Sequence, residues 1–127
     1  MSTDTSTLSP EPESLSGLAY VGIIAAVVSA VIHFRLGIGF ISSPLGISFI
    51  LAGLGFLGAV VLVLVNYRRR LVYTVGIPFT AIQIVLWYAF NFVAGDKAFP
   101  ADVGTLGAID KVAQLVLIVV LVVLLRE

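Results

Sequence analysis

The sequence predicts an all-α fold: a transmembrane four-helix bundle running up, down, up and down, preceded by a disordered acidic N-terminal tail. Four long apolar runs, separated by short polar segments, fill nearly all of the 127 residues after residue 16. The chain is 60% hydrophobic and 11% charged, and its mean hydropathy is +1.16. Soluble domains average about 25% charged residues, so these values indicate a chain folded in a lipid bilayer.

The first 16 residues form the expected tail. They are rich in Ser, Thr and Pro, carry Asp4, Glu11 and Glu13, and contain no Lys or Arg. So few apolar groups cannot offset the entropy lost on ordering, which predicts disorder. A signal peptide needs a basic leader and a short apolar core. This leader is acidic and the run behind it is long, so we expect that run to be retained as a span.

One domain over residues 17–127 is expected to contain spans at about 17–36, 46–65, 71–93 and 109–125. Each is near the ~17–25 residues that cross ~30 Å of hydrocarbon. Backbone groups in lipid must be hydrogen-bonded within their own segment, which requires helices. Short connections, one around Ser42-Ser43-Pro44, predict that consecutive spans pack as antiparallel neighbours. Pro78 is expected to kink the third span.

Basic residues predict the orientation. Arg68, Arg69 and Arg70 form a cluster between the second and third spans, and Arg126 follows the fourth. The positive-inside rule places these residues in the cytoplasm. We therefore expect a multi-pass protein of the cell membrane with both termini cytoplasmic. The arginine cluster is interpreted as a topology determinant that also meets anionic lipid.

Small residues recur at helical spacing in the first two spans. Gly22, Ala26 and Ala30 are each four residues apart, and so are Gly55 and Ala59. Such stripes let helix backbones approach closely in lipid. They predict close packing within the bundle, and any small face left over favours a homo-oligomer or assembly into a larger membrane complex.

Polar side chains inside the spans are costly in hydrocarbon, so each is a candidate site. Helix rise places several of them at related depths towards the outer face, and together they predict a polar funnel open to the outside. Its candidate residues are His33, Thr80, Gln83, Asn91, Asp110 and Gln114.

Structural roles compete with the funnel. Asp110 at a helix start suits the positive end of the helix dipole, and Lys111 near the interface can snorkel to water. His33 is interpreted as a hydrogen-bonded packing residue. Gln83 and Gln114 are expected to join helices by hydrogen bonds, and Trp87 and Tyr88 to fill the bundle.

Chemistry-bearing motifs are sparse. The chain has no Cys, one Met and one His, which excludes cysteine-ligated metals and thiol catalysis and argues against haem held by two axial ligands. We find no catalytic triad spacing, no paired buried carboxylates and no phosphate-binding loop. We therefore expect no enzyme activity, no cofactor or metal residues and no nucleic-acid partner.

The chain also contains short sequence segments of a kind seen in known small membrane proteins. The relevant segments are residues 33–37 (His-Phe-Arg-Leu-Gly), the glycine-rich run 52–58, the arginine cluster 68–70, and 77–80 leading to Trp87 and Tyr88. With these, the whole chain resembles small four-span membrane proteins of haloarchaea that belong to uncharacterised families. Its architecture is also loosely similar to DoxX-like proteins. The resemblance implies the topology and supplies no activity.

Two functions follow from these observations. The first is a non-enzymatic accessory or scaffold module that acts through helix packing, as the glycine-rich faces suggest. The alternative is an oligomeric transporter or channel for ions or small solutes that uses the polar funnel. A redox subunit ranks below both, because a single His per chain suits haem poorly.

Overall fold

The computed structural model describes residues 14–127, and most of the expected tail lies outside this range. The described chain forms four α-helices and one π-helical turn, with no strand. They are α2 (Gly17–Gly39), α3 (Pro44–Leu64), α4 (Arg69–Tyr88), η1 (Ala89–Val93) and α5 (Thr105–Arg126). All four helices are long and apolar enough to cross a membrane. The predicted all-helical fold is confirmed, and the chain has the character of a multi-pass membrane protein.

Local capping explains where the first two helices begin. The Ser16 side chain accepts a hydrogen bond from the Ala19 N–H at 3.2 Å, and the Ser43 side chain accepts one from the Gly46 N–H at 3.2 Å. These contacts satisfy amides that have no partner inside the helix. Pro44 follows Ser43 at the first helical position, where its missing N–H costs nothing.

The observed helices differ from the predicted spans mainly at α5. It begins at Thr105, whereas the hydropathy pattern predicted a start at 109. Hydropathy marks the part of a helix inside hydrocarbon, and the helix continues beyond it through residues 105–108. At Pro78, α4 continues as a helix on both sides of the proline. The π-helical turn then extends it to Val93.

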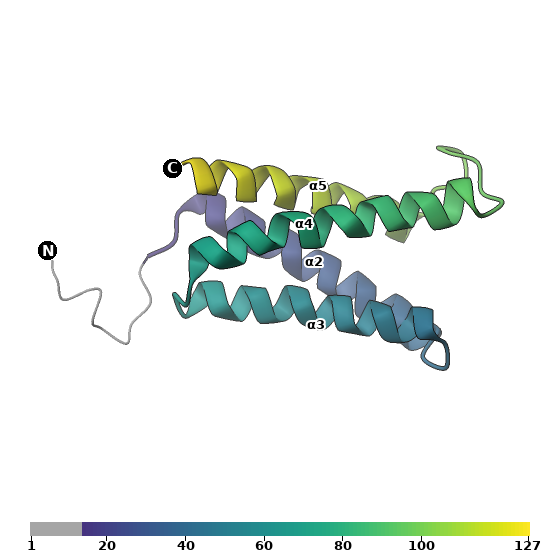
Figure 1. The fold of residues 1–127 in the computed structure, drawn as a ribbon, viewed down its shortest axis with the longest axis horizontal. Coiled ribbons are helices and arrows are strands. Elements are labelled where there is room, and N and C mark those ends of the chain that lie inside the picture. The colour runs from purple at the N-terminus through teal and green to yellow at the C-terminus, as the bar shows by residue number, and fades with distance from the viewer. Residues whose placement is uncertain (1–13) are drawn as a thin grey trace, which may run out of the picture.

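The helices form a ring in chain order (Figure 1). Helix α2 packs extensively against α3 and α5, and α4 packs against α5, but α3 and α4 meet at few positions. The predicted pairing of the first two spans is thus observed, whereas the second and third spans contact each other much less than their short connection suggested. The core lies between α2, α3 and α5 and contains Ala25, Ala26, Ala30, Phe56, Val60, Ala113, Leu117 and Leu121.

Two ends of the bundle are distinguished below. The arginine end holds the start of α2, the end of α5 and the turn between α3 and α4, and the far end holds the connections 40–43 and 94–104 (Figure 1). At the arginine end, Arg69 Nε donates to the Val63 carbonyl at 2.8 Å and Arg70 Nη2 donates to the Leu125 carbonyl at 3.0 Å. These guanidinium groups satisfy carbonyls near the C-termini of α3 and α5. The cluster therefore has a structural role besides the topological one expected.

Most glycines inside the helices serve packing within the chain. A Cβ on Gly22 would lie 3.0 Å from Val120 Cγ1, one on Gly53 2.8 Å from the Phe34 ring, and one on Gly55 2.6 Å from the Phe79 ring. Only Gly58, among glycines in the middle of the described helices, would direct a Cβ into open space. The stripes that suggested self-association are thus largely occupied inside one molecule.

Candidate functional site

A network of polar side chains joins three helices in the far half of the bundle. Helix α2 contributes Ser29 and His33, α4 contributes Gln83, and α5 contributes Asp110, Lys111 and Gln114. We call these six residues the polar network. Ser29 and Gln114 are completely buried, and His33 and Asp110 are 6% and 4% exposed. Buried polar atoms are costly without partners, so their connections decide what the network does.

Asp110 is the centre of the network. Its Oδ1 accepts a hydrogen bond from the Ser29 hydroxyl at 2.5 Å, and its Oδ2 accepts one from Lys111 Nζ at 2.5 Å. The residue lies in the second turn of α5, beyond the free amides of the helix N-terminus. The interpretation of Asp110 as a partner of the helix dipole is therefore wrong, because the helix begins five residues earlier at Thr105.

Lys111 turns into the bundle instead of snorkelling to water. Its ammonium also donates to Gln114 Oε1 at 2.9 Å and lies 5.4 Å from the centre of the Trp87 ring. The side chain is only 12% exposed. The expectation that Lys111 snorkels to water is wrong, because the Asp110 carboxylate compensates the ammonium inside the bundle.

Gln114 and Gln83 extend the network from α5 to α4. Gln114 Nε2 donates to Gln83 Oε1 at 3.1 Å, and Gln83 Nε2 donates to the Phe79 carbonyl at 3.0 Å. Gln114 Nε2 also lies 3.4 Å from Ser29 Oγ. The two glutamines join helices through their amides, which is the structural role that the sequence suggested for them.

His33 has one ring nitrogen committed to the protein and one available. Nδ1 lies 2.8 Å from the Ser29 carbonyl oxygen, and because a carbonyl only accepts, Nδ1 carries the proton of that hydrogen bond. In the neutral ring, Nε2 then has a lone pair, and no residue of the described chain forms a hydrogen bond with it. Phe49 and Phe56 flank the ring with centroids 5.8 Å away.

The polar network borders a cavity of about 1020 Å³, called here the large cavity. Its walls come from the far halves of α3 and α4, from the end of α2, from the start of α5 and from the connection before α5. Four residues of the network line it, namely His33, Gln83, Asp110 and Lys111. Trp87 and Asn91 also line it, and Asn91 Nδ2 donates to the Trp87 carbonyl at 2.8 Å.

Aromatic rings cluster beside the far end of this cavity. Trp87 contacts Phe92 with ring centroids 5.1 Å apart, and Tyr88 and Phe92 each contact Phe99 of the connection 94–104. Edge-to-face contacts of this kind hold rings in fixed relative positions. Tyr88 remains 43% exposed, so the expectation that it fills the bundle is wrong; it instead anchors the connection.

Comparison with known protein families identifies the family of this chain. A family model described as a family of unknown function, DUF7475, matches residues 3–125. The chain belongs to DUF7475. No curated protein and no solved structure matches it. Family membership thus agrees with the expected uncharacterised family, and the function has to be argued from the site itself.

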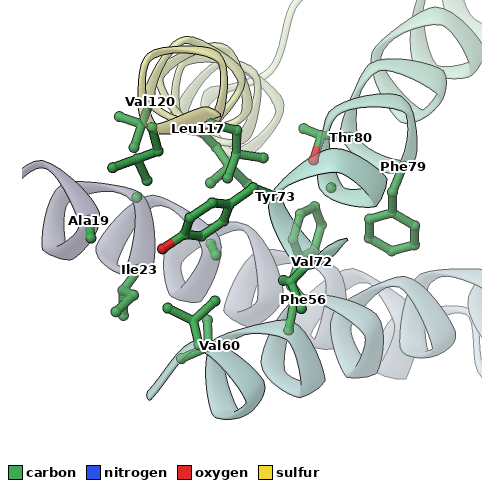
Figure 2. Close-up of a pocket in the computed structure, with 17 residues that line it drawn as sticks. Ala19, Ile23, Phe56, Val60, Val72, Tyr73, Phe79, Thr80, Leu117 and Val120 are labelled. Carbon is green, nitrogen blue, oxygen red and sulfur yellow. The ribbon is translucent and has the colours of Figure 1, made fainter. Parts of the chain in front are cut away.

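Thr80 does not join the other predicted funnel residues. It lines a second, small cavity of about 60 Å³ nearer the arginine end, among apolar side chains of all four helices (Figure 2). Its hydroxyl is completely buried and has no hydrogen-bond partner in the described part of the chain. Phe79 lines both cavities and packs over Gly55 where α4 meets α3, so its ring lies between them.

The structure thus brings His33, Gln83, Asp110 and Gln114 together, sets Asn91 on the wall of the same cavity, and separates Thr80 from them. Ser29 and Lys111 were missed as site residues. Ser29 lies four residues before His33, on the same helix face, and this spacing is the signal that could have identified it. Within residues 14–127 no group of three His, Cys, Asp or Glu side chains is arranged to hold a metal ion.

Proposed function

We propose that this protein is a non-enzymatic small-molecule binding and transport module of the membrane. The observation that carries the proposal is the large cavity, about 1020 Å³ in volume and bordered by four residues of the polar network. Ligand sites are commonly concave, mostly apolar and about 300–1,000 Å³ in volume, with a few polar groups that orient the ligand. The large cavity has these properties.

The disposition of the network supports binding over packing alone. A network that only joined helices would place its polar atoms between them, as the Gln114–Gln83 bond does. Here the imidazole of His33 and the ion pair of Asp110 and Lys111 border a space that no side chain of the described chain fills. Polar atoms bordering an unfilled cavity in a membrane helix bundle favour a solute site.

The orientation completes the proposal. We infer that the arginine end faces the cytoplasm, following the positive-inside rule, with both termini on that side. The large cavity then opens towards the outer face of the cell membrane. The scarcity of lysine beside arginine, together with the acidic leader, supports a salt-adapted archaeal source.

Cysteine labelling tests whether the cavity takes up solutes, since the chain has no native Cys. Ala52 lines the large cavity, whereas Leu54 lies two residues away, is 55% exposed and does not line it. In right-side-out vesicles, a small membrane-impermeant thiol reagent should label Ala52→Cys and leave Leu54→Cys unlabelled. Labelling of neither variant would show that water does not reach the cavity, and equal labelling of both would show that the reagent does not distinguish the cavity from the outer surface of α3. Either result would remove the basis of the proposal.

A scaffold function remains a second candidate because of one face of α3. Gly58 leaves open space on this face, and Leu54, Val61 and Val65 beside it are exposed. An open glycine flanked by exposed aliphatic side chains suits a second copy of the chain or a helix of a larger complex. Crosslinking in native membranes should lose any dimer in Gly58→Phe and retain it in Gly104→Phe, where the glycine also faces open space but lies outside the helices. A monomer before substitution would exclude this candidate.

A further inference from the structure

We infer that the large cavity takes an uncharged amphiphile, a lipid-like molecule with an apolar chain and a hydroxyl-bearing head group, which it receives sideways from the bilayer between α3 and α4. The inference rests on the proposed binding function and names its ligand class. Three features of the cavity carry it: the balance of charge in the polar network, the hydrogen-bonding atoms left available, and the composition of the walls.

Charge balance argues for a neutral head group. The carboxylate of Asp110 and the ammonium of Lys111 are paired at 2.5 Å and have side-chain exposures of 5% and 12%. In the connection 94–104, the cavity lining adds one further cation and one further anion, Lys97 and Asp102. The lysines and aspartates that line the cavity are thus equal in number, and a charged head group buried beside the Asp110–Lys111 pair would find no unpaired counterion there, which is strongly unfavourable.

Available donors and acceptors match a hydroxyl. His33 Nε2 and Asn91 Oδ1 are acceptors with no hydrogen-bond partner among residues 14–127. Lys111 has three N–H groups, of which Asp110 and Gln114 engage two. All three residues line the large cavity. A hydroxyl both donates and accepts, so it can meet either acceptor and the remaining ammonium N–H. A carboxylate or phosphate only accepts and would face the two acceptors without a proton.

The walls and the opening suit an apolar chain. Outside the polar network the lining is dominated by aliphatic and aromatic side chains, among them Leu36, Phe40, Phe49, Ile82, Leu86 and Phe90. Leu51 of α3 and Ile82 and Phe90 of α4 line the cavity and are also more than half exposed on the surface of the bundle. The cavity therefore opens sideways through the space between α3 and α4, which diverge towards the far end (Figure 1). In a membrane this opening faces lipid chains.

Trp87 makes the occupant measurable, because it is the only Trp of the chain and lines the cavity. Bromine atoms on a lipid chain quench tryptophan fluorescence at short range. The protein in vesicles of unbrominated phosphatidylcholine would be titrated with a brominated long-chain alcohol, with the matching brominated fatty acid at a pH where it is ionised, and with brominated-chain phosphatidylcholine. We expect saturable quenching by the alcohol, with half-saturation at least about tenfold lower than for the fatty acid. The phosphatidylcholine should give only weak, non-saturating quenching.

Two variants make the test specific. Ala52→Phe places a ring inside the cavity and should abolish saturable quenching, whereas Leu54→Phe adds the same ring outside it and should bind as the native chain does. Asp110→Asn removes the negative member of the ion pair and leaves the Lys111 ammonium uncompensated. It should reverse the preference, so that the brominated fatty acid binds more tightly than the alcohol. Circular dichroism would confirm that each variant retains its helices.

The outcomes separate this inference from the proposed function. Labelling of Ala52→Cys without saturable quenching by the alcohol would overturn the amphiphile and leave the solute site. Equal quenching by alcohol and fatty acid would refute the charge argument, as would an unchanged preference in folded Asp110→Asn. Saturable quenching that survives in Ala52→Phe would place the amphiphile outside the cavity and refute the inference. Absence of both labelling and quenching would refute both proposals.

Discussion

Replacement of Lys111 by Met tests the energetics of the polar network most directly. Methionine keeps a long unbranched side chain but removes the ammonium that compensates Asp110. The carboxylate, 5% exposed, would keep the hydrogen bond from the Ser29 hydroxyl and the nearby His33 ring, whose Nδ1 lies 3.8 Å from Asp110 Oδ1, but it would lose its lysine counterion. Breaking a buried ion pair from one side costs about 3–5 kcal/mol, because an uncompensated charge stays buried. The same reasoning predicts a similar loss for Asp110→Asn, which leaves the ammonium without a counterion.

The double variant distinguishes this explanation from simple loss of packing. With both charges removed, the ion pair, the hydrogen bond to Gln114 and the contact with Trp87 are lost, but no uncompensated charge stays buried. We therefore expect a total loss of about 1–2 kcal/mol, less than in either single variant. Reversible unfolding in mixed detergent micelles, followed by circular dichroism, would provide the four free energies of the cycle. Lys97→Met, at the other lysine of the chain, lies in an exposed connection and should change stability by less than about 0.5 kcal/mol.

The result that would refute the reasoning is additivity. If the double variant lost about the sum of the two single losses, Asp110 and Lys111 would act independently. A Lys111→Met loss below about 1 kcal/mol would likewise show that the Asp110 carboxylate has other compensation in the folded protein.

Further predictions concern the helices and their orientation. Gly46→Ala should lower the free energy of unfolding by more than about 2 kcal/mol, because the new Cβ would lie 1.9 Å from the Phe40 carbonyl oxygen. Gly58→Ala faces open space and should be neutral or raise that free energy by up to about 1 kcal/mol. Unfolding of both variants in detergent measures the difference. Ser43→Ala should lose about 1 kcal/mol through the missing cap of α3, and Ser43→Asp, which keeps an acceptor, should retain most of it. A protease site inserted beside Arg68 should be cut in inside-out vesicles and protected in intact cells; cleavage in intact cells would contradict the inferred orientation.

Much of the fold was predictable because its strongest determinant is local. The length of an apolar run sets whether a helix spans the bilayer, and four such runs are visible without any tertiary information. Helix ends were less accessible, since α5 begins at Thr105 among residues that are not strongly apolar. That difference moved Asp110 from the first turn to the second and changed its partner from backbone amides to Ser29.

The candidate site was predictable in its members more than in its geometry. The spacing of Thr80 and Gln83 places both on one face of α4. In the structure they line different cavities, with the Phe79 ring between them. No pattern in the sequence indicates the position of that ring. For Lys111, the sequence predicts only a depth near the membrane interface. Whether a lysine near the interface turns outward or inward depends on a carboxylate being within reach, and that is a tertiary property.

Helix α3 supplies no side chain to the polar network, whose hydrogen bonds run only through α2, α4 and α5. In the far half of the bundle, α3 contacts the other helices through apolar and aromatic side chains, such as Phe49, which packs against the His33 ring. The positions of the hydrogen-bonding atoms are therefore set by α2, α4 and α5, whereas α3 contributes an apolar wall to the large cavity. Changes to the cavity-facing side chains of α3 alter the shape of the cavity and leave every hydrogen bond of the polar network in place.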